Sequence, residues 1–290
     1  MTAWTLGVIG GSGLYEIDGL EDQRWIDVQG PWGAPSDQLL TGVIQGVKLV
    51  FLPRHGRGHR ISPTGINARA NIDALKRAGC TDILSVSAVG SLREELDPGM
   101  FVVVDQYIDR TVARASSFFG EGCVAHVSMA DPVCGRLAGL AAAAGRASGA
   151  RITEGGTYLA MEGPQFSTRA ESALYRQWGC DVIGMTGMPE AKLAREAELP
   201  YASVCMVTDY DCWREESVDV EVGHIMEVMH ANAAAAKALI KTLAQTLAQQ
   251  PRTPTPIDTC LDAALITPPA NRDPLLLQKL DAVAGRALSR

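Results

Sequence analysis

Short apolar runs rich in β-branched residues alternate along this 290-residue chain with longer runs at helical spacing. This alternation predicts an α/β fold, a single domain with a central mixed, largely parallel sheet flanked by helices. Several runs are apolar throughout, which is typical of strands covered on both faces. The predicted strands are Thr5–Ile9, Val47–Leu52, Ile83–Ala88, Phe101–Asp105, Thr157–Met161, Val182–Met185 and Ala202–Thr208.

The predicted helices lie between these strands and carry the usual boundary residues. Proline stands near the start of Pro63–Ala78, and a glycine follows its end. Ser167–Trp178 opens with Ser and Thr and has an acidic residue in its first turn. The other predicted helices are Asp131–Ser148, Pro189–Ala197 and Glu221–Gln249.

Composition changes after Gln249, where the run Pro251–Pro256 reads as an extended linker. We therefore expect residues 1–249 to form one domain. Residues 250–290 would be a proline-containing linker and a C-terminal appendage, packed on the domain or on a neighbouring subunit.

Charge and cysteine usage exclude several classes of protein. The 26 basic and 33 acidic residues give a net charge of −7, which argues against a binder of nucleic acid or of anionic membranes. No secretory signal and no membrane-length apolar run is present. The seven cysteines are odd in number and include no Cys-x-x-Cys, as expected for reduced thiols in a cytoplasmic protein.

Candidate anion-binding residues follow the predicted strands. Ser12 lies in a glycine-rich turn, Arg54 and His55 follow a second strand, Ser87 and Ala88 end a third, and Thr186 follows a fourth. An Arg-His pair suits a phosphate, because a charged fork and a second donor lie together. A tight turn and a solvated basic loop are the alternatives. A P-loop, a dinucleotide fingerprint and a Gly-x-Ser-x-Gly elbow are missing from the sequence.

Asp209 and Asp211 flank one residue at the end of the last predicted strand. If the chain is extended there, both carboxylates point to the same side. Such a pair serves acid–base chemistry on a glycosidic bond, or accepts hydrogen bonds from N–H groups of a ligand. Capping or calcium-type carboxylates are the alternative. His55 and His59 have helical metal-pair spacing, but the glycines around them argue against a helix, so we expect no metal site.

Seven blocks, taken in order, resemble the purine nucleoside phosphorylase superfamily, and within it the 5′-methylthioadenosine phosphorylases. They are GGSGL, RHGRGHRISP, SAVGSLREEL, VDQYIDRT, MEGPQFSTRAES, DVIGMTGMPEAKLARE and YASVCMVTDYDCW. The resemblance covers the chain from about Gly7 to Lys241 and implies a purine nucleoside phosphorylase-like fold.

The resemblance implies phosphorolysis of 5′-methylthioadenosine to adenine and 5-methylthioribose 1-phosphate, with inorganic phosphate as co-substrate and without metal or organic cofactor. It implies that Ser12, Arg54, His55, Ser87, Ala88 and Thr186 hold the phosphate. Met185 would lie beside the ribose, and Phe166, with Ser167 next to it, would contact the sugar or base.

The resemblance also assigns the two carboxylates. Asp209 would bind the imidazole-ring nitrogen and act as, or orient, the general acid, whereas Asp211 would accept from the 6-amino group. Relatives that prefer 6-oxopurines tend to place Asn there, so the Asp-Tyr-Asp sequence favours 6-aminopurines.

The 5′ substituent and the assembly are implied in the same way. Val222 and Ile225 would face the methylthio group. His126 matches a histidine contributed by the neighbouring subunit, which implies a homotrimer, and Leu265 would be an apolar tail residue that crosses with it.

Four other functions stay open at this point. A phosphorylase of methylthioinosine or of 6-oxopurine nucleosides is disfavoured by Asp211, and a nucleoside hydrolase by the Arg54-His55 pair. A silent nucleotide-binding module would not need the full set of residues, and a dinucleotide oxidoreductase would need the missing fingerprint.

Overall fold

The central sheet is organised around its longest strand, β5 (Asp82–Ser91). The computed structural model describes residues 3–11, 13–214 and 222–289, and for residues 222–227 it describes the backbone. Within these residues the sheet has eleven strands. They are β1 (Thr5–Gly10), β2 (Glu21–Ile26), β3 (Leu39–Ile44), β4 (Val47–Pro53), β5, β6 (Met100–Val104), β7 (Gln106–Asp109), β8 (Arg151–Glu154), β9 (Thr157–Ala160), β10 (Val182–Gly184) and β11 (Tyr201–Asp209).

Strand pairing confirms the predicted mixed, largely parallel sheet. One path runs β2-β3-β4-β1-β5-β10-β9-β7, and a branch from β5 runs through β11 and β6 to β8. Parallel pairs are β1 with β4 and β5, β5 with β11, β9 with β7 and β10, and β6 with β8. The strands β1, β4, β5 and β11 therefore share one direction and end at one edge of the sheet.

All seven predicted strands form, but β2, β3, β7 and β8 are absent from the sequence prediction. Strand β2 is polar and largely exposed, so it has no apolar run to detect. Strands β7 and β8 have four residues each and no fully buried position. Their pairing partners, rather than a local pattern, determine these strands.

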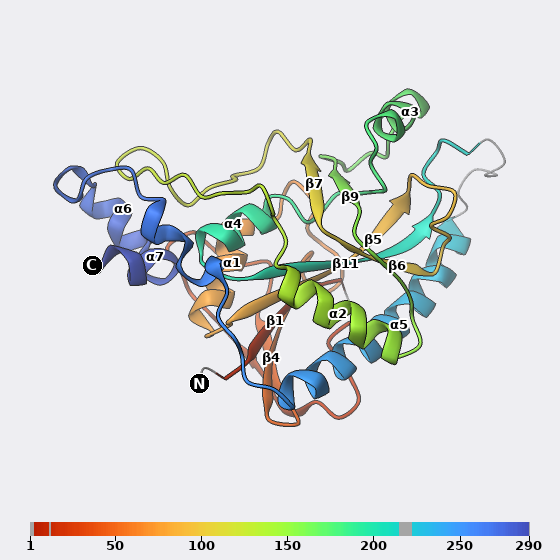
Figure 1. The fold of residues 1–290 in the computed structure, drawn as a ribbon, viewed down its shortest axis with the longest axis horizontal. Helices are drawn as coiled ribbons and strands as arrows, with labels where there is room; N and C mark the ends of the chain where they lie inside the picture. Colours follow the sequence, from red (N-terminus) through yellow and green to blue (C-terminus); the bar gives the residue numbers. More distant parts are fainter. Residues whose placement is uncertain (1–2, 12, 215–221, 290) are drawn as a thin grey trace.

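Helices cover both faces of the sheet (Figure 1). Helices α1 (Ala68–Arg77) and α4 (Glu190–Glu196) contribute to the core on one face, and α2 (Gly135–Ala147) and α5 (Val222–Ala248) to the core on the other. Helix α3 (Arg169–Gln177) lies apart from both and has only two buried residues. None of the described helices combines the length and hydropathy needed to cross a membrane.

Helix ends follow local chemistry. Thr168 and Glu171 form a reciprocal capping box at the start of α3, as the first-turn acid predicts. The Asn67 side chain accepts from the Ala70 amide at the start of α1. Helix α1 therefore begins five residues after the proline that the sequence suggested as its start.

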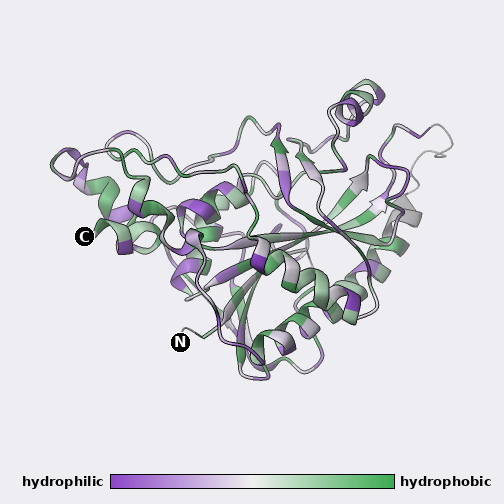
Figure 2. Cartoon of the chain, viewed as in Figure 1, coloured by the Kyte–Doolittle hydropathy of each residue, from purple (hydrophilic) through white to green (hydrophobic). Residues whose placement is uncertain are grey.

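The C-terminal segment packs against α1 and α4. It contains the 3-10 helices η1 (Pro256–Ala263) and η2 (Pro269–Asn271) and the helices α6 (Pro274–Lys279) and α7 (Asp281–Leu288). Leu261, Leu280 and Val283 belong to the same core as α1 and α4. Figure 2 shows hydrophobic and hydrophilic residues mixed along α6 and α7, as expected for helices with one face on a core.

Candidate active site

Arg54, Ser87 and Asp209 lie at the sheet edge where the parallel strands end. Gly10 pairs with Pro53, and the Arg54 amide donates to the Gly10 carbonyl at 2.9 Å. Strand β11 brings Asp209 level with Gly90 of β5. Carboxyl ends of parallel strands are where open α/β sheets bind ligands. Ser12, one of the predicted phosphate residues, lies outside the described residues.

Arg54 is buried and paired with Glu190, the first residue of α4. Its Nε donates to Glu190 Oε1 at 2.6 Å and its Nη2 to Glu190 Oε2 at 3.2 Å. Further donations go to the Ser85 hydroxyl at 2.7 Å and the Val86 carbonyl at 2.9 Å. Burial opposes the Arg54 charge, but the Glu190 carboxylate raises the pKa of Arg54 above its usual value, so Arg54 stays charged.

The Arg54 fork is therefore largely committed within the protein. Among the described residues, one hydrogen on Nη1 has no acceptor, and it is the donor left for a phosphate. From the sequence we expected the Arg54 guanidinium to donate to a phosphate through two N–H groups. The assignment of Arg54 to phosphate stays a prediction.

His55 is a neutral imidazole at physiological pH. Its Nδ1 lies 2.8 Å from the Ile61 carbonyl, which can only accept, so Nδ1 carries the hydrogen and Nε2 carries a lone pair. Burial lowers the pKa of His55 to about 4. The ring stacks on His59 with centroids 4.3 Å apart. His55 can accept a hydrogen bond from a protonated phosphate oxygen, whereas the sequence suggested a second donor.

Ser87 and Thr186 are both buried hydroxyls. The Ser87 oxygen has no hydrogen-bond partner at normal distance among the described residues, although the Cys205 thiol lies close enough to interact with it. The Thr186 hydroxyl lies 3.2 Å from the Tyr158 hydroxyl, and the Thr186 amide donates to that same oxygen at 3.3 Å. Ala88 follows Ser87 on β5 and pairs with Met206.

Arg114 and Glu162 hold the segment that carries Met185. Arg114 Nη1 donates to the Met185 carbonyl at 2.7 Å and to the Met188 carbonyl at 2.9 Å. Glu162 accepts from Arg114 Nε at 2.9 Å and from the Thr64 hydroxyl at 2.6 Å. These hydrogen bonds outweigh partial burial and lower the pKa of Glu162 to about 2, so this carboxylate stays charged.

The Phe166–Ser167 segment joins strand β9 to α3. In the single chain the Phe166 side chain is 79% exposed. The Ser167 carbonyl accepts from Cys212 Sγ at 3.2 Å. Ser167 is therefore tied to the turn that carries Asp211, whereas Phe166 is open to solvent.

Asp209 and Asp211 both approach Gly90, but not through the extended chain that the spacing assumed, because β11 ends at Asp209 and Asp211 lies in the turn that follows. A Cβ placed on Gly90 would stand 3.1 Å from Asp209 Oδ1 and 3.4 Å from Asp211 Cβ. Burial raises the pKa of Asp209 against a hydrogen bond from Thr208, and the nearby Asp211 raises it further. Burial also raises the pKa of Asp211, whose Oδ2 has no partner at normal distance among the described residues.

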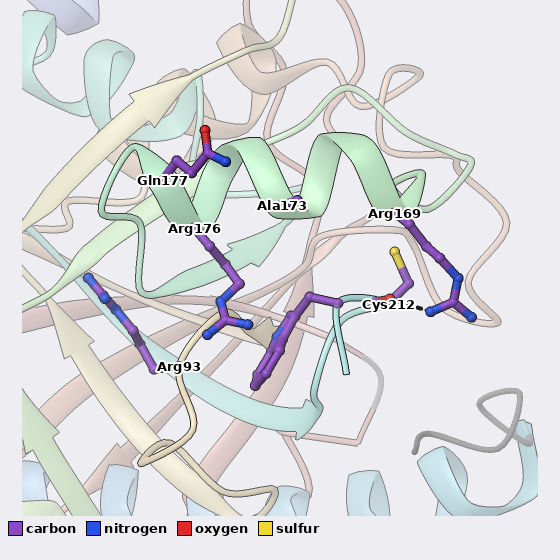
Figure 3. Close-up of a pocket in the computed structure, with 7 residues that line it drawn as sticks. Arg93, Arg169, Ala173, Arg176, Gln177 and Cys212 are labelled. Carbon is purple, nitrogen blue, oxygen red and sulfur yellow. Dashed lines mark hydrogen bonds between the residues drawn. The ribbon is translucent and has the colours of Figure 1, made fainter. Parts of the chain in front are cut away.

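An open cleft of about 510 Å³ lies beside this turn (Figure 3). Arg169 and Arg176 reach into it from α3, and Arg176 stacks on the Trp213 ring with its guanidinium carbon 3.6 Å from the ring centroid. Cys212 lines it, but none of the predicted phosphate-binding or base-binding residues does. The cleft is therefore a neighbour of the candidate site rather than part of it.

Besides Ser12, three predicted residues lie outside this cluster or have side chains outside the described residues. The side chains of Val222 and Ile225 are outside the described residues, although both lie at the start of α5. His126 is exposed on the segment that follows β7 and runs toward the C-terminal helices (Figure 1). Among the described residues, no three His, Cys, Asp or Glu side chains gather as metal ligands.

Sequence reasoning missed Glu190, Arg114 and Gly90. Glu190 gave no local signal, because an acidic residue in the first turn is ordinary for a helix such as EAKLARE, which carries three other charged residues. Arg114 had no signal either, since its acceptors lie in two distant segments, residues 161–162 and 185–188. Gly90 gave no signal, because its closeness to Asp209 and Asp211 exists only where β11 lies beside β5.

Known proteins resemble this chain over most of its length. A family profile described as the phosphorylase superfamily matches residues 5–245. The S-methyl-5′-thioadenosine phosphorylase of Cereibacter sphaeroides is 62% identical over 98% of both chains, and that of Bradyrhizobium diazoefficiens is 58% identical over 99% of both.

Solved structures of methylthioadenosine phosphorylases resemble this chain as well. A methylthioadenosine phosphorylase from an antarctic soil metagenomic library superposes with a TM-score of 0.93 at 44% identity, covering 98% of this chain and 99% of that one. An adenosine/methylthioadenosine phosphorylase mutant from Schistosoma mansoni, in complex with adenine, gives 0.79 at 36% identity, covering 86% and 93%. The chain belongs to the phosphorylase superfamily and, within it, to the family of the S-methyl-5′-thioadenosine phosphorylases.

Proposed function

We propose that this protein cleaves 5′-methylthioadenosine with inorganic phosphate, releasing adenine and 5-methylthioribose 1-phosphate. The observation that carries the proposal is the pair Asp209 and Asp211, two half-buried or buried carboxylates held together over Gly90. The named relatives, which share most of the chain, are phosphorylases of this nucleoside.

The raised pKa values of both carboxyl groups fit the chemistry at the purine. Cleavage of the N-glycosidic bond moves negative charge onto the departing base, and a carboxyl group with a raised pKa can share its proton with the ring nitrogen. Asp211, whose Oδ2 has no hydrogen-bond partner at normal distance among the described residues, would accept from the 6-amino group of adenine.

The phosphate would lie at the other end of the site. The Ser87 hydroxyl, the remaining Arg54 N–H, Thr186 and the backbone near Ala88 supply donors, and His55 Nε2 supplies an acceptor for a protonated oxygen. Ser12 would add a hydroxyl, Met185 would line the ribose, and Phe166 would close over the sugar or base. No metal or organic cofactor takes part in this scheme.

We further propose a cytoplasmic homotrimer in which His126 reaches the nucleoside of the neighbouring copy and Val222 and Ile225 face the methylthio group. The seven cysteines are all unpaired in the chain, which suits a reducing compartment.

The deciding experiment measures adenine release from 5′-methylthioadenosine by the purified protein, with and without inorganic phosphate. Release that requires phosphate supports the phosphorylase. Release without phosphate identifies a hydrolase, and turnover of methylthioinosine or inosine alone identifies a 6-oxopurine phosphorylase. Measuring the sedimentation coefficient of the same sample tests the trimer.

A further inference from the structure

The segment that follows β7 is an extended strap, residues 122–130, with two distinct faces. Cys123, Ala125, Val127 and Met129 pack against the main core, whereas the even-numbered residues between them are exposed. This period of two places His126 on the outward face, beside Val124.

The C-terminal appendage fixes the strap through backbone pairing. Ala125 and Leu265 form an antiparallel bridge, the His126 amide donates to the Ala264 carbonyl, and the Ile266 amide donates to the Val124 carbonyl, both at 2.9 Å. These contacts set the register of the strap, and a slip of one residue would turn His126 inward.

Two further hydrogen bonds join the appendage to the strap. The Thr267 hydroxyl accepts from the Val124 amide at 2.8 Å, and the Asp273 amide donates to the Gly122 carbonyl at 2.8 Å. Gly122 adopts a left-handed conformation with φ of 90°, and a side chain there would collide with Asp273.

The appendage itself is anchored in the domain by charge pairs. Arg286 of α7 donates to both oxygens of Glu198 at 2.6 Å, and Glu198 is nearly fully buried. Arg252 donates to Asp82 Oδ2 at 2.5 Å, where both side chains are buried. The appendage is thus anchored to the domain by buried charge pairs, and an anchored segment can fix the position of another.

We infer that the C-terminal appendage is a positioning element of the active site, with Thr267 holding His126 in the register that points it at the nucleoside of a neighbouring copy. The inference rests on the proposed function, since it gives the appendage a role through His126. The exposed apolar side chains of Val124 and Ile266, 36% and 59% exposed, flank His126 on the face that a second copy would cover.

The test uses Thr267→Val, which keeps the shape of the side chain and removes the acceptor for the Val124 amide. Loss of one such hydrogen bond should raise the KM for 5′-methylthioadenosine about two- to tenfold. We expect kcat and the KM for phosphate to change by less than about twofold, because the phosphate residues lie on other segments. Thr267→Ser retains the hydroxyl and should behave as the wild type.

Two further variants separate positioning from general damage. Thr253→Val changes an exposed threonine of the linker whose hydroxyl makes no described hydrogen bond, so it should leave all constants unchanged. In a His126→Ala background, Thr267→Val should add nothing to the KM, because its effect acts through His126.

An unchanged KM in folded Thr267→Val, or an effect that persists in the His126→Ala background, would overturn the inference. A wild-type protein without phosphate-dependent adenine release would instead overturn the proposed function. Thermal unfolding of each variant shows whether a raised KM accompanies loss of the fold.

Discussion

Asp209 and Asp211 approach each other across Gly90, a glycine of the adjacent strand β5. The Asp209 Oδ1 atom and the Asp211 Cβ atom lie 3.1 Å and 3.4 Å from the position that a side chain on Gly90 would take. The space for the two carboxyl groups therefore depends on the absence of one methyl group.

We expect Gly90→Ala to lower kcat/KM for 5′-methylthioadenosine about ten- to a hundredfold, because the new methyl displaces both carboxyl groups. Overpacking should lower the free energy of unfolding by about 1–3 kcal/mol. Gly139→Ala in α2, where a Cβ meets open space, is the matched control and should keep full activity. Steady-state kinetics at saturating phosphate measure this loss. A Gly90→Ala enzyme with the wild-type kcat/KM would contradict the prediction.

Asp211→Asn should change the preferred base. An amide donor in place of a carboxylate oxygen mismatches the 6-amino group and matches a 6-oxo group. The ratio of kcat/KM for 5′-methylthioadenosine to that for methylthioinosine should fall about ten- to a hundredfold. Both substrates are assayed with one enzyme preparation, so differences in the active fraction cancel. An unchanged ratio would remove Asp211 from the base site.

The Arg54–Glu190 pair should matter more for stability than any surface pair. Glu190→Leu leaves a buried guanidinium without its carboxylate and should cost about 3–5 kcal/mol of unfolding free energy. The double variant Arg54→Met with Glu190→Leu should recover much of that loss, since no charge stays buried.

The exposed pair Arg146–Glu154 supplies the comparison for this prediction. Both side chains are about half exposed, so Glu154→Leu should cost less than about 1 kcal/mol. Urea unfolding curves measure all three variants. Equal losses of unfolding free energy for Glu190→Leu and Glu154→Leu would show that burial does not make the Arg54–Glu190 pair more important for stability.

His55 should make the protein less stable at mildly acidic pH. Its pKa is about 4 in the folded chain and about 6.5 when exposed, so between these values the unfolded chain binds the extra proton. The contribution is fully present above pH 6.5 and is lost as the pH falls to 4. Allowing for partial exposure of the ring, the loss is on the order of 2 kcal/mol.

His55→Gln should remove this part of the pH dependence, which unfolding curves at pH 7, 5.5 and 4.5 would show as a smaller loss than in the wild type. His230→Gln, at an exposed histidine of α5, is the control and should retain the wild-type slope. Parallel curves for the wild type and His55→Gln would mean that the folded chain binds this proton as readily as the unfolded one.

Local patterns predicted seven of the eleven strands and the helices α1 to α5, because buried strands and amphipathic helices leave apolar signals, although the apolar strand β3 was missed. They did not predict β2 or β8, whose residues become a strand only by pairing with a neighbour. The spacing of Asp209 and Asp211 drew attention to the pair, but the extended chain assumed for it is wrong, since Asp211 lies in the turn after β11 and reaches Gly90 from there.

The sequence by itself determined the fold class, the family and the types of residue at each strand end, because these depend on composition and order along the chain. Only the tertiary structure decided how those residues are used. It turned the Arg54 fork toward Glu190, made His55 an acceptor and set Asp209 against Asp211 over Gly90. It also joined His126 to the C-terminal appendage. Each of these relationships depends on contacts between residues far apart in the chain, and on burial that no local pattern records.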